Sequence, residues 1–189
     1  MTDAHLTSTS GSGGQVEFNI AQVHEAVERA VPDRECIVFR QRRLTYRDVG
    51  DRSRQIANAL LDAGLGKSVP RSQLAPHQSG QDHLAICLHN GNEYLECMLG
   101  AFKARVVPFN VNYRYVAEEL AYLLRDADAR GIVYHSAFAP VLGEVLDAVP
   151  GTGVRWQVPD DSGIGLLEGS RWYDDALAGQ PTVLAEGTA

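Results

Sequence analysis

The 189-residue sequence has few cysteines and no excess of positive charge. Its three cysteines, Cys36, Cys87 and Cys97, lie far apart and form no Cys-x-x-Cys pair or Cys/His cluster. Isolated thiols in apolar runs are typical of a reduced core, so neither a disulfide framework nor a zinc site is expected. The 17 Lys and Arg against 24 Asp and Glu give a net charge of -7. This charge excludes a general electrostatic attraction to nucleic acid.

Long apolar runs are also missing. No stretch approaches the roughly 20 apolar residues that cross a bilayer, so we expect no transmembrane segment. The first residues, MTDAHLTSTSGSGG, lack the basic start and apolar centre of a signal peptide. We therefore expect a cytoplasmic protein. Because Ser, Thr and Gly dominate its start, residues 1–18 are predicted to be a disordered tail.

The sequence contains no complete phosphate-binding loop. Residues 64–68 read GLGKS, but the full pattern needs a glycine five positions before Gly66, where Leu61 stands. The segment also follows a predicted helix instead of joining a strand to a helix. A helix C-terminus with a solvated Lys67 is the better interpretation.

Other catalytic or metal-binding sets are lacking too. His77, His83 and His89 are spaced along a predicted loop and the two ends of one predicted strand, which is too far apart for a shared ion. We find no Ser/His/Asp set and no carboxylate pair in the sequence. No complete catalytic apparatus can therefore be assembled from this chain alone.

The sequence does contain a readable strand, helix and strand between Asp82 and Tyr115. Leu84–Leu88 and Val106–Val111 are short apolar runs typical of strands buried on both faces. Asn92 is the predicted N-cap of the helix between them, and Lys103 lies near its C-terminus. The side chains expected to pack on the sheet are Leu95, Met98, Leu99 and Phe102. A crossover helix between such strands implies parallel pairing.

The rest of the chain continues this alternation. Further helices are predicted at 19–30, 46–63, 116–127, 138–148 and 172–178, and further strands at 36–39, 44–46, 131–134 and 154–158. The fold class is therefore α/β: a partial doubly wound, mostly parallel sheet with helices on both faces, plus a small N-terminal hairpin. Residues 67–81 form a long loop that is either functional or a mobile insertion. Residues 19–178 form an incomplete unit, and residues 179–189 a polar tail.

Polar side chains follow two strands of the central unit. His89, Asn90 and Asn92 come after the first strand, where open α/β sheets bind ligands. After the second strand come Asn110, Asn112 and Arg114. We predict that these six residues form a wall of a substrate pocket. The alternative is that they satisfy free backbone groups where each strand ends.

Two long stretches resemble a known family. They are LTYRDVGDRSRQIANALLDAGLG at 44–66 and HLAICLHNGNEYLECMLGAFKARVVPFNVNYRYVAEELAYLLRDADARGIVYH at 83–135. These residues resemble the N-terminal part of the adenylate-forming acid:CoA ligases, most closely the AMP-forming fatty-acyl-CoA synthetases. The resemblance covers about Ile20–Leu177, and His89–Tyr115 is its most specific part.

The resemblance implies that residues 19–178 are the first α/β subdomain of the family's N-terminal domain. The implied reaction joins ATP and a fatty acid into an acyl-adenylate, from which CoA displaces AMP. ATP, magnesium and CoA are thus implied for a full-length member. The Ser/Thr/Gly-rich loop ending in Pro-Lys-Gly, which holds the ATP phosphates in that family, and the C-terminal domain with its catalytic lysine are not in the sequence.

Without these parts we expect the chain alone to bind none of these cofactors and to be inactive. Its expected partner is the remainder of a synthetase, or a second copy through exposed sheet edges. An alternative is a stand-alone α/β binding or interaction module. Two smaller departures from the family are Arg105, where a Gly usually follows Lys-Ala, and the longer loop at 67–81.

Overall fold

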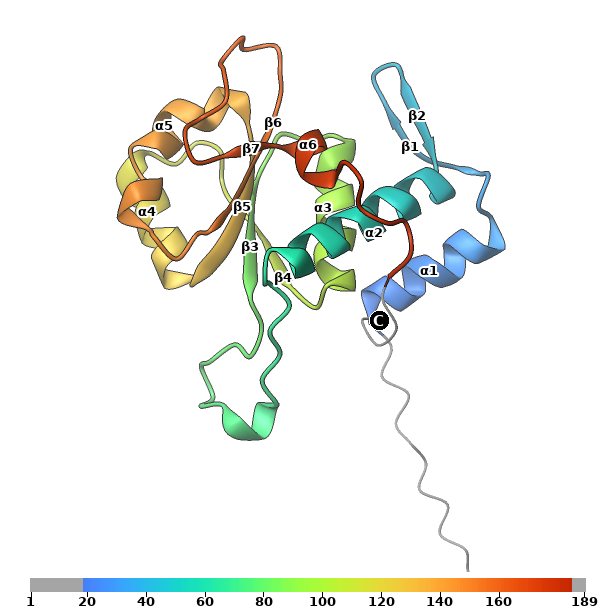
Figure 1. The fold of residues 1–189 in the computed structure, drawn as a ribbon, viewed down its shortest axis with the longest axis horizontal. Helices are drawn as coiled ribbons and strands as arrows, with labels where there is room; N and C mark the ends of the chain where they lie inside the picture. The colour runs from blue at the N-terminus through green and yellow to red at the C-terminus, as the bar shows by residue number, and fades with distance from the viewer. Residues whose placement is uncertain (1–18, 185–189) are drawn as a thin grey trace, which may run out of the picture.

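The protein folds into a parallel sheet covered by helices on both faces (Figure 1). A computed structural model describes residues 19–184. The predicted disordered tail at 1–18 lies outside the described residues, as do residues 185–189 of the predicted polar tail. None of the helices within 19–184 is long and apolar enough to cross a membrane.

The sheet has five parallel strands in the order β4-β3-β5-β6-β7. Their bounds are β3 His83–Cys87, β4 Val107–Asn110, β5 Ala129–His135, β6 Val154–Val158 and β7 Arg171–Trp172. The chain passes from β3 to β4 on one side and then returns to β5 on the other side of β3. The reversal creates a topological switch point between β3 and β5, and the predicted mostly parallel sheet is confirmed.

Helices lie on both faces of this sheet, because successive strand residues point to opposite sides. Leu84, Ile86 and Val133 pack beneath α2 (Tyr46–Asp62), α3 (Asn92–Lys103) and α6 (Tyr173–Leu177). Ala85 and Ile132 pack beneath α4 (Ala117–Asp126) and α5 (Ala139–Gly143) on the other face. The predicted α/β fold with two covered faces is therefore correct.

One predicted helix is broken in the structure. Instead of a continuous helix at 138–148, the chain forms a 3₁₀ turn at Ser136–Phe138, the short α5, and a second 3₁₀ turn at Leu146–Ala148. Gly143, a poor helix former, is the last residue of α5. The apolar side chains still reach the core, because Leu142 and Leu146 are both buried.

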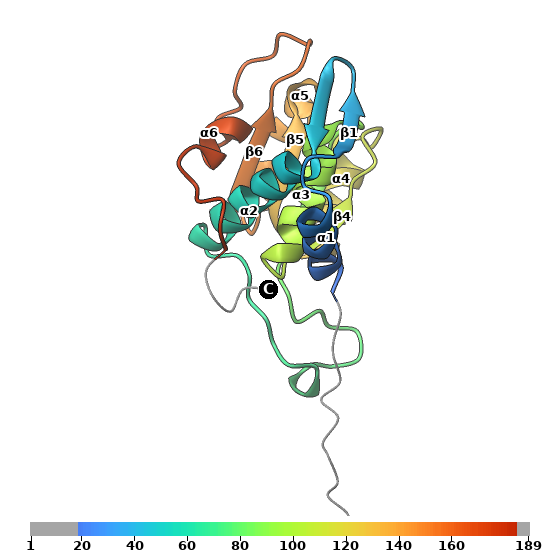
Figure 2. The ribbon, with the colours of Figure 1, turned by 90° about the vertical axis from the view of Figure 1, so that its right-hand side faces the viewer.

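The N-terminal segment forms an outer layer on the α2 and α3 side (Figures 1 and 2). It consists of α1 (Ile20–Ala30) and the antiparallel hairpin of β1 (Glu35–Phe39) and β2 (Arg42–Thr45). The predicted hairpin is confirmed. The apolar stripe of α1 points outward, with Ile20 60% and Val23 54% exposed, while Glu28 is buried.

Helix α3 buries only part of the face that its apolar spacing predicts, since Leu99 is buried and Met98 packs against the core. Leu95 is exposed, whereas Glu96 and Lys103 are only 1% and 0% exposed. The reason is that α3 lies between the sheet and the α1–α2 layer, where ion pairs and hydrogen bonds compensate the buried charges. The N-cap is Gly91, one residue before the predicted Asn92.

The last described residues cross α2 as a strap. The Asn58 amide donates hydrogen bonds to the carbonyl oxygens of Pro181 (2.8 Å) and Val183 (3.1 Å). The Arg54 Nε donates to the Thr182 carbonyl at 2.6 Å. Side chains of α2 thus provide hydrogen-bond donors for backbone carbonyls of residues that lie outside any helix or strand.

The Lys67–Gln81 loop projects from the end of the sheet opposite the hairpin tip (Figure 1). An antiparallel bridge between Ser68 and Gln81 closes its base. The Arg71 guanidinium donates to the carbonyls of Ala75 (3.0 Å), Pro76 (3.0 Å) and Gln78 (3.2 Å). The loop therefore carries its own hydrogen-bond framework, which includes the 3₁₀ turn η1 (Arg71–Gln73).

Candidate functional site

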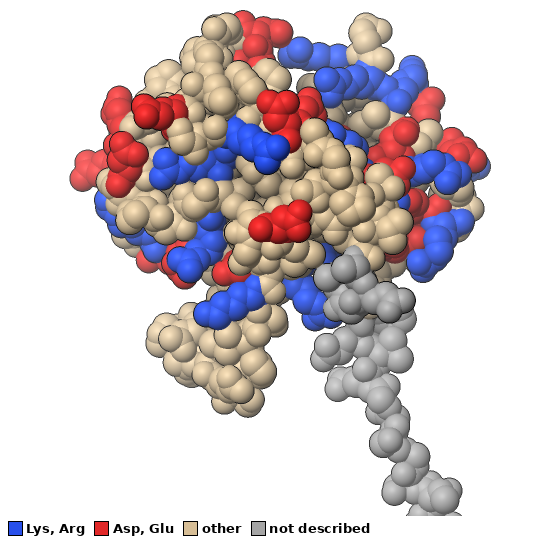
Figure 3. Space-filling view, viewed as in Figure 1, with Lys and Arg blue, Asp and Glu red and all other residues tan. Residues whose placement is uncertain are grey.

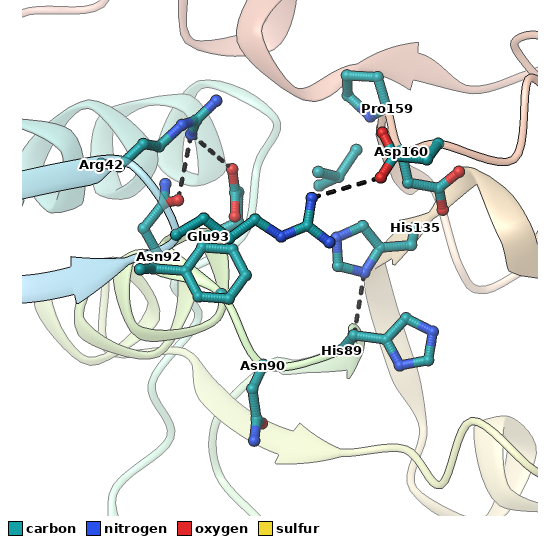
Figure 4. Close-up of a pocket in the computed structure, with 13 residues that line it drawn as sticks. Arg42, His89, Asn90, Asn92, Glu93, His135, Pro159 and Asp160 are labelled. Atoms are coloured by element: carbon teal, nitrogen blue, oxygen red, sulfur yellow. Dashed lines mark hydrogen bonds and ion pairs between the residues drawn. The ribbon is translucent and has the colours of Figure 1, made fainter.

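A polar pocket of about 300 Å³ lies at the carboxyl ends of β3, β5 and β6 (Figure 4). This position coincides with the switch point between β3 and β5, where open α/β sheets bind ligands. The hairpin forms its outer wall. The lining residues are Phe39, Arg40, Arg42, His89, Asn90, Gly91, Asn92, Glu93, His135, Val158, Pro159, Asp160 and Asp161.

Arg42 attaches the hairpin to the start of α3. Its guanidinium donates to Asn92 Oδ1 at 3.1 Å and to Glu93 Oε1 at 3.0 Å (Figure 4). Glu93 lies in the first turn of α3, where the helix dipole favours a carboxylate. Arg42 therefore links the hairpin to the N-terminus of α3.

Asn92 connects the pocket to a buried polar network. Its side chain is 3% exposed, and its amide donates to Glu96 Oε1 at 2.8 Å. The other Glu96 oxygen accepts the Tyr173 hydroxyl at 2.9 Å and lies 3.4 Å from Arg52 Nε. The network joins α2, α3 and α6 behind the pocket wall.

His89 and His135 are linked across the switch point. The His89 backbone N–H donates to His135 Nδ1 at 3.0 Å (Figure 4). Because Nδ1 accepts this bond, the proton of the neutral ring lies on Nε2. Burial lowers the pKa of His135, and the Asp160 carboxylate opposes this shift only in part. The pocket thus holds a neutral imidazole.

Three aromatic rings pack around the ring of His89. The His89 ring lies 4.8 Å from Tyr113, 4.9 Å from Phe138 and 5.6 Å from His135, measured between centroids. The Arg114 guanidinium lies over the Tyr113 ring at 5.7 Å. These contacts fix the His89 ring by packing, in the manner expected for edge-to-face aromatic pairs.

The opposite wall carries an ionised carboxylate. Burial raises the pKa of Asp160, but hydrogen bonds from Ser162 and from the Ala137 N–H (2.8 Å) hold it below the usual range. At the pocket mouth Arg40 and Asp161 form an exposed ion pair at 3.4 Å. The pocket therefore offers guanidinium, carboxylate and neutral imidazole groups to a ligand.

The structure brings together only half of the six residues predicted for the pocket wall. His89, Asn90 and Asn92 line the pocket, although the Asn90 side chain points away from the other labelled residues (Figure 4). The other three, Asn110, Asn112 and Arg114, follow the edge strand β4 and are not among the lining residues.

The Asn112 side chain caps its own turn. Its Oδ1 accepts the Arg114 N–H at 3.1 Å, which matches the alternative that side chains at this strand end satisfy backbone groups. The sequence interpretation also missed Arg42, His135 and Asp160. His135 could have been predicted from the sequence, since it is the last residue of β5 and lies at the same carboxyl end of the sheet as His89.

Among residues 19–184, no group of His, Cys, Asp and Glu could hold a metal ion. The three cysteines are free thiols, and burial raises the pKa of Cys87 to about 12. The pocket is thus equipped to bind and orient a ligand, and it contains no pair of nucleophile and base.

Comparison with known proteins identifies the class. The AMP-binding enzyme family matches residues 23–162, so the chain belongs to this family. The pocket and the five-stranded sheet both fall largely within the matched range. The fold class and the family expected from the resemblance are therefore correct.

The relatives within the family are acyl-CoA ligases. The chain is 50% identical over 161 residues to the medium-chain acyl-CoA ligase Mig of Mycobacterium avium, covering 85% of this chain and 29% of Mig. It is 31% identical over 147 residues to a medium/long-chain-fatty-acid and 3-oxocholest-4-en-26-oate CoA ligase of Mycobacterium marinum, covering 78% of this chain and 24% of that ligase. The chain therefore spans less than a third of these relatives.

Solved structures share the fold. The anthranilate CoA ligase AuaEII in complex with anthranoyl-AMP superposes with a TM-score of 0.76 at 21% identity, over 92% of this chain and 30% of that one. A putative long-chain-fatty-acid CoA ligase from Rhodopseudomonas palustris gives a TM-score of 0.73 at 24% identity, over 90% and 39%. At these identities the likeness concerns the fold.

Proposed function

We propose that this chain is the N-terminal part of an AMP-forming fatty-acyl-CoA synthetase. The observation that carries this proposal is the 50% identity to the medium-chain acyl-CoA ligase Mig over 161 residues. The whole enzyme would convert ATP, a fatty acid and CoA into acyl-CoA, AMP and pyrophosphate. Since ATP and CoA are made in the cytoplasm, the same proposal places the enzyme there.

The chain by itself would not activate a fatty acid. It matches only 29% of Mig, and the described pocket supplies no Gly-rich loop for phosphate groups. ATP, magnesium and CoA would bind to the whole synthetase, and none of them to this chain alone. Preorganised donors at the transferring groups supply most of the rate enhancement in such reactions. Without them we expect the rate of adenylation to be lower by many powers of ten.

Within the whole enzyme, residues 19–178 would act as a scaffold subdomain. His89, Asn90 and Asn92 would form a wall of the substrate pocket together with His135, which sequence reasoning did not include. Asn110, Asn112 and Arg114, which do not line the described pocket, would lie beyond this wall at the end of β4. The position of the pocket at the switch point of the sheet supports this assignment.

The remainder of the synthetase would cover the apolar surface of this chain. Large apolar side chains are exposed on α1 and at α4, and β4 is an edge strand whose outer side is free among the described residues. In isolation these surfaces would favour self-association. The exposed residues concerned are Ile20, Val23, Val27, Val116 and Tyr122.

A chimera tests the proposal. Residues 20–177 of this chain would replace the matching segment of Mig, and acyl-CoA formation from octanoate, ATP and CoA would be measured. We expect a rate within about tenfold of Mig, because 50% identity preserves the core packing that positions the site. The 189-residue chain alone, assayed by ATP–pyrophosphate exchange, is expected to give no signal above buffer.

Two outcomes would contradict the proposal. One concerns the assignment to the synthetase, and the other concerns the inactivity of the isolated chain. A chimera that is folded by circular dichroism and yet inactive would refute the assignment to the synthetase. Fatty-acid-dependent pyrophosphate exchange by the chain alone would refute its inactivity. Unmodified Mig serves as the positive control for both assays.

A further inference from the structure

A serine and a histidine meet at the base of the Lys67–Gln81 loop. Ser79 Oγ lies 2.7 Å from His83 Nε2, within hydrogen-bond distance. His83 begins β3, whereas His89 follows the other end of that strand, so this pair lies at the opposite end of the sheet from the pocket. Neither family membership nor the pocket assigns a role to it.

The hydrogen bonds of His83 determine which nitrogen carries the proton. Its Nδ1 contacts the backbone carbonyl oxygen of Ala127. A carbonyl can only accept a hydrogen bond, so Nδ1 is the donor. Nε2 of the neutral ring is then the acceptor, and the Ser79 hydroxyl donates its proton toward it. This is the arrangement of a nucleophile and its general base.

The Ala127 carbonyl occupies the place that a carboxylate takes in a Ser-His-Asp triad. Ala127 is the C-cap of α4, where unpaired carbonyls carry the negative end of the helix dipole. The carbonyl orients the ring through Nδ1 but carries no full charge, so we expect a slower nucleophile than in a triad with a carboxylate.

The backbone around Ser79 is held in place. The Val69 N–H donates to the Gly80 carbonyl at 2.7 Å, and the Gln81 N–H donates to Ser79 Oγ at 3.3 Å. A Cβ on Gly80 would come within 2.4 Å of the Val69 carbonyl oxygen, so only glycine fits next to Ser79. Ser79 is exposed and His83 half-buried, so a small reagent can reach the hydroxyl.

The surroundings of the pair suit an uncharged substrate. Residues 72–81, SQLAPHQSGQ, contain no Lys, Arg, Asp or Glu, and Figure 3 shows the projecting loop as largely uncharged. The neighbouring Arg71 donates its guanidinium hydrogen bonds to the backbone carbonyls of Ala75, Pro76 and Gln78, so it is not paired with the Ser79 hydroxyl.

We propose that Ser79, activated by His83, is a nucleophile that accepts acyl groups from small activated esters and thioesters. Ser79 Oγ bonds to the acyl carbon, and the bond from that carbon to the leaving oxygen or sulfur breaks. His83 Nε2 takes the hydroxyl proton and passes it to the leaving group. The products are an acyl ester of Ser79 and a free alcohol or thiol. The proposal is independent of the synthetase assignment.

The test uses the full chain with p-nitrophenyl acetate as the probe. Peptide mass spectrometry of the labelled protein is expected to find acetyl on Ser79, and Ser79→Ala is expected to abolish that label. His83→Gln keeps an amide donor for Ala127 and an acceptor for Ser79 but removes the base. It is expected to slow acetylation of residue 79 by about 100-fold, the usual lower range for general-base catalysis.

Matched controls lie in the same loop. Ser72→Ala and His77→Gln change a serine and a histidine outside the pair, and both are expected to label like the unmodified chain. Acetyl found only on lysines or Cys36 would overturn the proposal, as would an unchanged rate in His83→Gln. Because Ser79 is exposed, Ser79→Ala folds regardless of the role of the pair, and its result stands alone if His83→Gln fails to fold.

Discussion

The Tyr173 hydroxyl donates a hydrogen bond to Glu96 at 2.9 Å, although the two residues are 77 positions apart. Both side chains are 1% exposed. Burial, Cys97 and the Glu96 carboxylate together raise the pKa of Tyr173 well above its usual value, so the hydroxyl keeps its proton. Tyr173 is the contact through which the last helix satisfies a carboxylate buried behind the pocket.

Replacing Tyr173 by Phe should therefore destabilise the fold. Tyr173→Phe removes one donor from a buried carboxylate, which costs about 1–3 kcal/mol of unfolding free energy. Urea denaturation followed by circular dichroism measures the change. Tyr122→Phe removes the same hydroxyl from a residue that is 67% exposed. It should change the unfolding free energy by no more than about 0.5 kcal/mol. Equal effects of the two changes would contradict the buried network.

His24 is expected to make the stability depend on pH. Both of its ring nitrogens are buried without a hydrogen-bond partner among the described residues. Burial and the Lys103 ammonium lower the pKa of His24 from 6.5, while Glu28 and Glu25 oppose this shift. The unfolded chain then binds the proton more readily, so the unfolding free energy should fall as the pH drops below 6.5.

The variant His24→Leu tests this expectation. It removes two unpaired polar atoms and should raise the unfolding free energy by about 1 kcal/mol at pH 7.5. It should also reduce the loss of stability between pH 6.5 and 5. His135, whose pKa is lowered mainly by burial, should contribute to the loss that remains. A pH dependence identical to that of the unmodified chain would show that the pKa of His24 is the same in the folded and unfolded states, and would contradict the expectation.

Gly100 allows α3 to approach α2 closely. A Cβ at Gly100 would lie 2.4 Å from Ile56 Cγ2, and Ile56 is fully buried. Gly100→Ala should therefore cost about 1–3 kcal/mol by overpacking, despite the better helix propensity of alanine. Gly153→Ala is the matched control, because a Cβ there meets nothing within 4 Å. Thermal denaturation should separate the two variants clearly.

Arg105 ends α3 in a backbone conformation that favours glycine. Its φ is 58°, and the Val106 N–H donates to the Ala101 carbonyl at 2.9 Å in the manner of a Schellman cap. Arg105→Gly should raise the unfolding free energy by about 0.5 kcal/mol. This value is the backbone strain that glycine relieves minus the larger conformational entropy that glycine loses on folding.

Arg105→Ala is the control for this change, because it removes the side chain but keeps the strain. It should not stabilise the protein. A gain in both variants would assign the effect to the arginine side chain instead of the backbone. The comparison needs only chemical denaturation of the three proteins under one condition.

His135 should be visible by NMR as a neutral Nε2–H tautomer. The His89 N–H bond to Nδ1 and the burial of the ring both favour this form, and the pKa of His135 is expected below 6.5. The nitrogen chemical shifts of the ring report the tautomer directly. His135→Gln identifies the resonance by its loss. An Nδ1–H tautomer at pH 7 would contradict the pocket geometry.

The order of helices and strands follows directly from the sequence. The central strand is an unbroken apolar run, Leu84–Leu88, and parallel pairing follows from the helices between the strands. The buried faces of α1 and α3 do not follow from it. Glu96 and Lys103 are buried because Tyr173 and Glu25, distant in sequence, provide partners for them. Apolar periodicity contains no information about such partners.

The same limit applies to the site residues: a position at the end of a strand can be predicted from the sequence, whereas a contact between distant segments cannot. His89 could be predicted, because it follows a parallel strand and that end of the sheet faces ligands. Arg42 could not, since it reaches the pocket from a hairpin 50 residues away from Asn92. Asn110 and Asn112 follow a parallel strand too, but β4 is at the edge of the sheet, away from the switch point.

The strap across α2 has a consequence for biosynthesis. The Asn58 amide can form its hydrogen bond to Pro181 only after Pro181 has been synthesised, 123 residues later. At about 5–20 residues per second, the ribosome leaves this amide without its final partners for roughly 6–25 s. During that interval α2 presents an open flank on the nascent chain. Translation speed and chaperone access while residues 59–181 are synthesised should therefore influence the yield of folded protein.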